Sequence, residues 1–106
     1  AIADLPIEQL NESTARRLVV GGKLMLQLVS IKAGSRPPAH SHPHEQVIWI
    51  TSGRMSFRLG DEPPGECRPG GIVVIPGGVQ HETWFPEDTE LVEIFSPIRE
   101  DLLPKG

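Results

Sequence analysis

Short runs of apolar residues, many of them alternating with polar ones, recur along the whole chain. The clearest run is Met55, Phe57 and Leu59, which alternate with Ser56 and Arg58 in the period of two that a half-buried strand shows. Further runs rich in β-branched and aromatic residues predict strands over residues 16–20, 24–32, 46–51, 72–75, 80–85 and 90–95. Turn-forming clusters separate these runs, and no window shows helical periodicity beyond a few residues. The pattern predicts an all-β protein of antiparallel strands with little helix, either a sandwich or a barrel.

Length and composition narrow the class of protein. The chain has 106 residues and a mass of 11.6 kDa, which suits one domain over residues 1–106, with an arm at 1–14 and a polar tail at 96–106. Hydrophobic residues make up 38% and charged residues 23%, so neither a disordered nor a membrane-spanning chain is expected. Residues 60–65 are rich in Gly and Pro and predict a loop.

Charge and cysteine content bear on partners and compartment. Fourteen acidic against ten basic residues give a net charge of −4, which disfavours binding to nucleic acid. The single cysteine, Cys67, excludes an internal disulfide and fits a reducing compartment. Residues 1–10 lack the basic start and apolar stretch of a signal peptide. We therefore expect a cytoplasmic protein without membrane or nucleic-acid partners.

All four histidines lie in two places, His40, His42 and His44 in one loop and His81 far along the chain. Alternate residues of an extended segment point to the same side, so His40, His42 and Gln46 can converge, and His81 can join them from another strand. Imidazole is the commonest ligand of transition metals, and an amide can add a carbonyl oxygen. The pattern predicts a metal site, although the same histidines could equally be solvated loop residues.

The spacing around these residues resembles the two motifs of the cupin superfamily. The first motif, over residues 34–53, has its matching positions at Gly34, His40, His42, Gln46 and Gly53. The second, over residues 70–85, has them at Gly70, Pro76, Gly78 and His81. The resemblance implies a jelly-roll-like, RmlC-like cupin barrel. It also implies one divalent transition metal ion (Zn, Ni, Fe, Mn or Cu) held by His40, His42, Gln46 and His81.

One ligand position departs from the motif, because the usual cupin glutamate falls at Gln46. The neighbouring Glu45 has the opposite parity and should point away, so we expect Gln46 to be the ligand. Four neutral ligands leave the charge of the metal uncompensated, which favours an anionic substrate and Lewis-acid chemistry over redox chemistry. For His44, next to Pro43 in the loop, contact with the metal or substrate stays open, beside a supporting contact or a surface position.

The end of the chain is similar to small cupins of the pectin-degradation type, which convert unsaturated monouronates into open-chain keto forms. The similarity lies in residues 93–101 and in the string HSHPHEQ over residues 40–46. It implies that Glu93 and Arg99 are catalytic and that Phe95 contacts the substrate. For Trp49 we expect either packing against the sugar ring as well or a place in the core. The family acid is Asp, whereas this chain has Glu93, so the longer side chain leaves the substrate open. Glu93 could instead be a structural residue paired with Arg99 or Arg58, and Arg99 could equally be a surface charge in a loose tail.

Three functions remain open at this point. The first is a metal-dependent lyase or isomerase acting on a small anionic sugar or keto acid. The second is a binding protein without catalysis, and the third is an Fe(II)-dependent oxygenase using the same site. We further expect a homodimer formed through the N-terminal arm and strand 24–31, which is apolar on both faces, and a solvated edge at Arg16 and Arg17.

Overall fold

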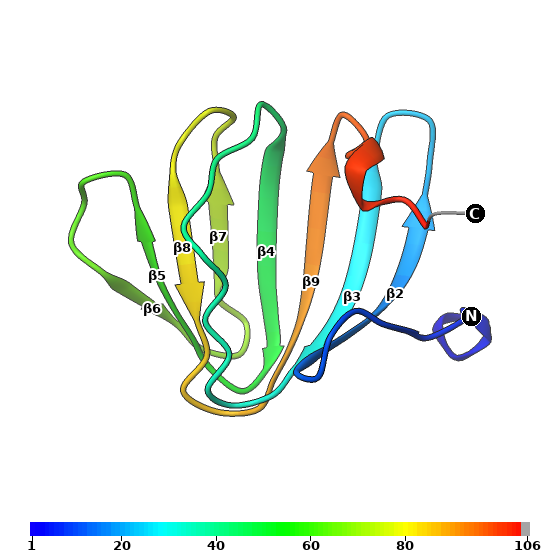
Figure 1. Ribbon diagram of the computed structural model, residues 1–106, viewed down its shortest axis with the longest axis horizontal. Helices are drawn as coiled ribbons and strands as arrows, with labels where there is room; N and C mark the ends of the chain where they lie inside the picture. The colour runs from blue at the N-terminus through cyan, green and yellow to red at the C-terminus, as the bar shows by residue number, and fades with distance from the viewer. Residues whose placement is uncertain (105–106) are drawn as a thin grey trace.

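The computed structural model describes residues 1–104, and it is built from two antiparallel sheets (Figure 1). The larger sheet has six strands in the order β1-β2-β3-β9-β4-β7, and the smaller has the order β6-β5-β8. The strands are β1 (Glu8–Gln9), β2 (Thr14–Val20), β3 (Met25–Ile31), β4 (Glu45–Ser52), β5 (Met55–Leu59), β6 (Gly65–Cys67), β7 (Ile72–Ile75), β8 (His81–Trp84) and β9 (Thr89–Ser96). Within residues 1–104 the helical segments are two short 3-10 turns, η1 (Ile2–Asp4) and η2 (Glu100–Leu102). The all-β, jelly-roll-like prediction is confirmed.

Seven of the strands fall where the hydrophobic pattern predicts them, within a few residues at each end. The two that it does not predict are β1 and β6, and residue 65, assigned to a loop, begins β6. A strand of two or three residues is too short to show a period of two, so its pairing is visible only once the neighbouring strand is in place. Among the described residues, no helix has the length and apolar character that crossing a membrane requires.

Alternation along the strands separates an apolar interior from the outer face. On β4, Ile48 and Ile50 are buried while Trp49 between them is exposed, and on β7 Val73 and Ile75 are buried while their neighbours are exposed. These residues pack with β3, β5 and β9 in one core cluster, whose buried members are Val29, Ile31, Ile48, Ile50, Met55, Cys67, Val73, Ile75, Phe85 and Leu91. Complete burial of one such aliphatic side chain contributes about 1.5–3 kcal/mol, so this cluster is the main source of stability.

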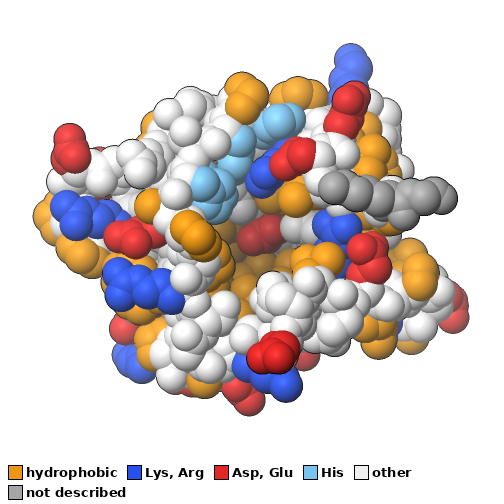
Figure 2. Space-filling view, viewed as in Figure 1, with side chains coloured by type: hydrophobic (Ala, Val, Ile, Leu, Met, Phe, Trp, Pro, Cys, Tyr) orange, Lys and Arg blue, Asp and Glu red, His pale blue; other side chains and the backbone are white. Residues whose placement is uncertain are grey.

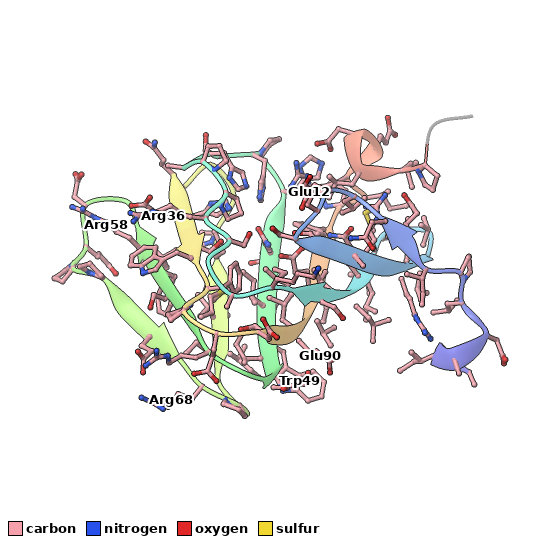
Figure 3. All side chains as sticks on the ribbon, turned by 60° about the horizontal axis from the view of Figure 1, so that its bottom comes forward. Glu12, Arg36, Trp49, Arg58, Arg68 and Glu90 are labelled. Carbon is pink, nitrogen blue, oxygen red and sulfur yellow. The ribbon has the colours of Figure 1, made fainter. Side chains whose placement is uncertain are left out.

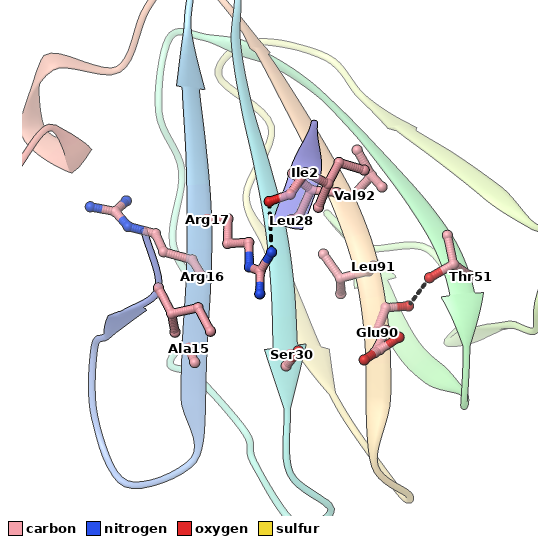
Figure 4. Close-up of a pocket in the computed structure, with 11 residues that line it drawn as sticks. Ile2, Ala15, Arg16, Arg17, Leu28, Ser30, Thr51, Glu90, Leu91 and Val92 are labelled. Atoms are coloured by element: carbon pink, nitrogen blue, oxygen red, sulfur yellow. Dashed lines mark hydrogen bonds between the residues drawn. The ribbon is translucent and has the colours of Figure 1, made fainter. Parts of the chain in front are cut away.

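The N-terminal arm lies against the outer face of the larger sheet. Ile2 and Ile7 line a groove there with Leu28 of β3 and Val92 of β9 (Figure 4). The Arg17 Nη1 donates a hydrogen bond to the carbonyl oxygen of Ile2 at 2.6 Å, which ties the arm to β2. The second apolar face of strand 24–32 is therefore partly covered within the chain itself.

The register of three neighbouring strands places polar residues inside the barrel. Gln27 of β3 pairs with Glu93 of β9, and Phe95 of β9 pairs with Gln46 of β4. Directly paired residues lie on the same face of a sheet, and this face is the interior because Phe95 and Gln46 are buried. The interior is thus apolar towards β5 and β7 and polar along one band of β3, β9 and β4.

The β4–β5 turn requires glycine at position 53, because Gly53 has a φ of 84°, in the left-handed region that other residues rarely adopt. A methyl group there would meet the carbonyl oxygen of Asp88 and would lie 2.6 Å from Thr89 Oγ1. Gly34 has a similar φ of 89°, but nothing lies within 4 Å of its added Cβ. Alanine at position 34 would therefore introduce backbone strain alone, whereas alanine at position 53 would introduce strain together with a steric clash.

We expect Gly53→Ala to lower the free energy of unfolding by about 3 kcal/mol, because it combines left-handed strain with overpacking. Gly34→Ala should cost only about 1–2 kcal/mol, since strain alone applies. Urea denaturation followed by circular dichroism measures both variants. Equal losses in the two variants would contradict the close approach of the 88–89 backbone to Gly53.

Candidate metal centre

Backbone pairing between distant segments brings three histidines together. The loop before β4 runs alongside the start of β8, where the amide nitrogens of His40 and His81 each donate to the other residue's carbonyl oxygen, at 2.9 and 2.8 Å. One ligand atom from each of His40, His42 and His81 lies within 4.8 Å of the others. His42 and His81 are buried and His40 is exposed, so the group lies at the rim of the interior, and the three could hold a metal ion.

Each of these imidazoles is oriented by the same kind of contact. The Nδ1 atoms lie 3.1, 2.9 and 3.0 Å from the backbone carbonyl oxygens of Pro38, His44 and Val79 respectively. A carbonyl only accepts, so each neutral ring carries its proton on Nδ1 and keeps a lone pair on Nε2. The Nε2 of His81 is buried and has no hydrogen-bond partner among residues 1–104. Three neighbouring lone pairs, one of them otherwise without a partner, fit a bound cation.

Gln46 adds an oxygen to this group. Its side chain is buried, and Oε1 lies 3.0 Å from the Nε2 of His42. With the His42 proton on Nδ1, both atoms are acceptors, and their close approach is favourable with a cation nearby. Glu45 is exposed, as its opposite parity predicts. Three imidazole nitrogens and an amide oxygen form a neutral donor set that suits divalent transition metals.

The charge state of the histidines matches this role. Burial lowers the pKa of His42, and the positive charge of Arg99 lowers it further. Burial also lowers the pKa of His81, assisted by His40 and His42. Because the neutral imidazole is the ligand form, both residues are ready to bind a cation at neutral pH.

An aromatic ring and a guanidinium extend the site from the histidines. The Phe95 ring centre is 5.9 Å from that of His42, and the Arg99 Cζ is 5.2 Å from the Phe95 centroid. The Arg99 side chain is only 14% exposed, and its Nη2 is 2.6 Å from Asp101 Oδ2, a hydrogen bond that lowers the pKa of Asp101. Arg99 is therefore held over Phe95 rather than lying in a loose tail.

Glu93 completes the polar band. It shares the interior face of β9 with Phe95, is half-buried, and accepts a hydrogen bond from Gln27 Nε2 at 2.9 Å. Burial raises the pKa of Glu93, against the opposing effects of Gln27 and Arg99. Arg99 pairs with Asp101, and Arg58 is exposed on β5, so neither is an ion-pair partner of Glu93. Figure 2 shows a hollow on this face of the molecule, with histidine side chains at its rim and an acidic side chain within it.

The structure does not bring Trp49 to this hollow. Its side chain is 45% exposed on the outer face of β4, because Ile48 and Ile50 on either side face the interior (Figure 3). The expectation that Trp49 packs against a substrate with Phe95 is therefore wrong. Strand parity, applied to Trp49 as it was to Glu93, would have excluded it.

His44 lies next to the three clustered histidines without joining them. Its ring centre is 5.8 Å from that of His42, and its carbonyl oxygen is the acceptor that orients the His42 ring. Its contribution to the site is thus a backbone contact that determines which His42 nitrogen is free.

Two interior residues were missed by reasoning from the sequence. Gln27 is buried between Met25 and Val29, and Arg16, expected at a solvated edge, is only 4% exposed. Arg17 is the residue of that pair that faces outward, towards the arm. The signal for Gln27 was its parity, since it lies on the same side as two apolar residues that must be buried.

Comparisons with known proteins agree with this geometry. The family model described as "Cupin domain" matches residues 27–96. A dimethylsulfoniopropionate lyase, DddQ, of Ruegeria pomeroyi is 35% identical over 60 residues, covering 57% of this chain and 30% of the lyase, so the chain spans under a third of that relative.

Solved structures share the fold. An RmlC-like cupin from Shewanella frigidimarina superposes with a TM-score of 0.88 at 24% identity, covering 95% of this chain and 91% of that one. KdgF from Halomonas sp. superposes with a TM-score of 0.88 at 22% identity, covering 97% of each chain. With both motif regions inside the matched segment and the same barrel in the solved structures, the chain belongs to the cupin family.

Proposed function

We propose that this cupin is a metal-dependent lyase or isomerase acting on a small anionic substrate. One observation carries the proposal, namely that a cluster of three neutral imidazoles lies beside a half-buried carboxyl group and a guanidinium. A cluster of ligands next to an acid–base group and an anion-binding group is what proton-transfer chemistry on a carboxylate requires. A lyase among the relatives is consistent with this class of reaction.

Each group of residues in the site has its own role in this reaction. His40, His42, His81 and Gln46 hold the ion, which when bound supplies Lewis-acid polarisation of a substrate oxygen. Their neutrality leaves the centre positive and so attractive to anions. Arg99 binds a substrate carboxylate in exchange for part of its pairing with Asp101, and Phe95 packs against the apolar face of the substrate.

Glu93 transfers the proton. Its pKa is raised by burial towards the pH at which it works, and this is the condition under which one carboxyl group can both accept and return a proton. A positioned acid–base residue contributes about 10²–10⁴-fold to the rate.

The substrate that the C-terminal resemblance favours is an unsaturated monouronate. In its conversion to an open-chain keto form, the anomeric hydroxyl loses its proton as the bond from the anomeric carbon to the ring oxygen breaks, which gives an aldehyde and an enolate. A proton added at carbon then turns the enolate into a ketone, so the product is an isomer and no oxidant is needed. Glu93 can perform both transfers.

The sequence similarity to the dimethylsulfoniopropionate lyase suggests a second class of substrate. With a substrate of this class, Glu93 of the present chain would remove a proton from the carbon next to a carboxylate. A leaving group would then depart from the following carbon with the bonding pair of electrons. The same Arg99 would hold the carboxylate, so the two candidates differ in substrate and share their machinery.

We expect the protein loaded separately with Zn²⁺, Ni²⁺, Mn²⁺ or Fe²⁺ to remove the ultraviolet absorbance of an unsaturated monouronate. Glu93→Gln should lower kcat by about 10²–10⁴-fold, because it removes the proton carrier. Glu90→Gln is the matched control, since Glu90 is exposed on the opposite face of the same strand. Full metal occupancy, native circular dichroism and no turnover would rule out this substrate. Activity that requires both O₂ and Fe²⁺ would instead indicate an oxygenase.

We expect Gln46→Ala to weaken metal binding at least about tenfold, because it removes one donor from the set. Glu45→Ala should leave the affinity unchanged, since the adjacent side chain is exposed and points outward. Titration calorimetry with Zn²⁺ measures both. Equal effects in the two variants, or a larger effect in the Glu45 variant, would contradict the proposed ligand.

We also propose that the chain forms a homodimer through the outer face of its larger sheet. Trp49 and Ile72 are directly paired across β4 and β7, and both are exposed together with Val74 on the edge strand β7. A contiguous exposed apolar patch of this kind is typical of an interface. The contact predicted through the N-terminal arm and strand 24–31 remains a second candidate surface, because Ile2, Ile7 and Leu24 are exposed as well.

We expect light scattering at micromolar concentration to give twice the chain mass. Ile72→Lys should shift the protein to monomer, because it places a charge in the apolar interface. Asp61→Lys, in an exposed loop of the smaller sheet, is the control and should stay dimeric. A monomeric parent protein would refute the proposal.

A further inference from the structure

We infer that Arg16 and Gln27 are positioning residues that fix the side chain of Glu93 and the tail that carries Arg99. The inference rests on the proposed acid–base role of Glu93. It concerns two residues outside the metal ligands and outside the groups expected to contact substrate.

Three side chains form one directed chain of hydrogen bonds across β2, β3 and β9. Arg16 Nη1 donates to Gln27 Oε1 at 2.5 Å, and Gln27 Nε2 donates to Glu93 Oε2 at 2.9 Å. Arg16 is 4% exposed and Gln27 is 5% exposed. Buried hydrogen bonds to charged groups are stronger than exposed ones, so both contacts constrain the side chains that they join.

Arg16 determines which group of each hydrogen bond in this series is the donor and which is the acceptor. A guanidinium can only donate, so the Gln27 group facing Arg16 must be the carbonyl oxygen. The Gln27 amide then presents its NH₂ group to Glu93, which favours the carboxylate as acceptor and holds one of its oxygens. Without Arg16 the amide could turn over and offer its oxygen instead, which would favour a protonated Glu93.

The same guanidinium also reaches the C-terminal segment. Arg16 Nη2 donates to the carbonyl oxygen of Leu102 at 2.5 Å and lies 3.1 Å from Glu8 Oε2. Leu102 belongs to η2, whose preceding residue is Arg99. Arg16 therefore connects to Glu93 through one amide and to the Arg99 segment through one backbone carbonyl. A single buried cation orients both ends of the site.

The charges that act on Glu93 come from several elements. Arg99 of the tail and Arg16 of β2 favour its ionised form, and His40 of the loop adds to this only when its ring is protonated. Gln27 is its hydrogen-bond donor, and Ile48 of β4, its cross-strand partner, is apolar. Burial raises the pKa of Glu93, and the hydrogen bond from Gln27 opposes this effect. Removing that donor must therefore move the ionisation midpoint of Glu93 to higher pH.

The experiment uses the full chain loaded with Zn²⁺, with Glu carboxyl carbons observed by ¹³C NMR across a pH titration and Glu93 assigned from Glu93→Gln. We expect Gln27→Met to raise the Glu93 midpoint by about one pH unit, the effect of one hydrogen bond to a charged group. Gln27→Asn, which keeps an amide that is too short to reach, should do the same and replaces the Met variant if that one fails to fold. Arg16→Met should move the midpoint in the same direction, and Arg16→Lys, which keeps a donor-only cation, should partly restore it.

Turnover provides the second measurement. In both Gln27 variants kcat should fall about 10–100-fold at neutral pH with KM unchanged, because Gln27 acts through Glu93 and does not contact the substrate. Gln9→Met, at an exposed glutamine of β1, is the matched control and should change neither the midpoint nor kcat. A Glu93 midpoint that stays at the parent value in folded Gln27 variants would overturn the inference.

Failure of the proposed function would look different. If the parent protein turns over neither candidate substrate but its Glu93 midpoint still shifts in the Gln27 and Arg16 variants, the positioning of Glu93 stands and only the substrate assignment falls. If the parent is active and the variants keep its midpoint and its kcat, the proposed function stands and the positioning role is wrong.

Discussion

The site depends on two backbone hydrogen bonds between His40 and His81, which join a turn-rich loop to the first residue of β8. Neither segment carries all three clustered histidines, so the cluster exists only while this pairing holds. A third bond, from the amide of Gly78 to the carbonyl oxygen of His42, fastens the same loop to the turn before β8. Rigid backbone pairing is what allows short polar side chains to be held in a fixed geometry without a metal to organise them first.

Polar groups inside an apolar barrel must each find a partner, and here they form one connected band. The band runs from the histidine rim through Gln46, reaches the Phe95–Glu93 face of β9, and ends at Gln27 and Arg16. Burying a cation as completely as Arg16 is costly unless it is paired and hydrogen-bonded. Its two terminal nitrogens contact Glu8, Gln27 and Leu102, while its Nε has no partner among residues 1–104. The hydrogen bonds that stabilise these buried polar groups therefore also orient the side chains of the site.

Parity and spacing predicted most of the fold and much of the site. The period of two in β5, the His40–His42 pair and the parity that separates Gln46 from Glu45 could all be read locally, because each depends on residues close in sequence. Arg16 could not be placed in this way, since its burial follows from the pairing of β2 with β3 and from the return of the tail across the barrel. Trp49 was misassigned for a different reason, because its chemical suitability was given more weight than the direction of its side chain.

The positions of the aromatic residues have a practical consequence for spectroscopy. The chain has two tryptophans and no tyrosine, so its intrinsic fluorescence comes from Trp49 and Trp84 alone. Trp49 is on the outer face of β4, and Trp84 of β8 lies under the guanidinium of Arg36. Emission from Trp49 should therefore change when the outside of the sheet is covered.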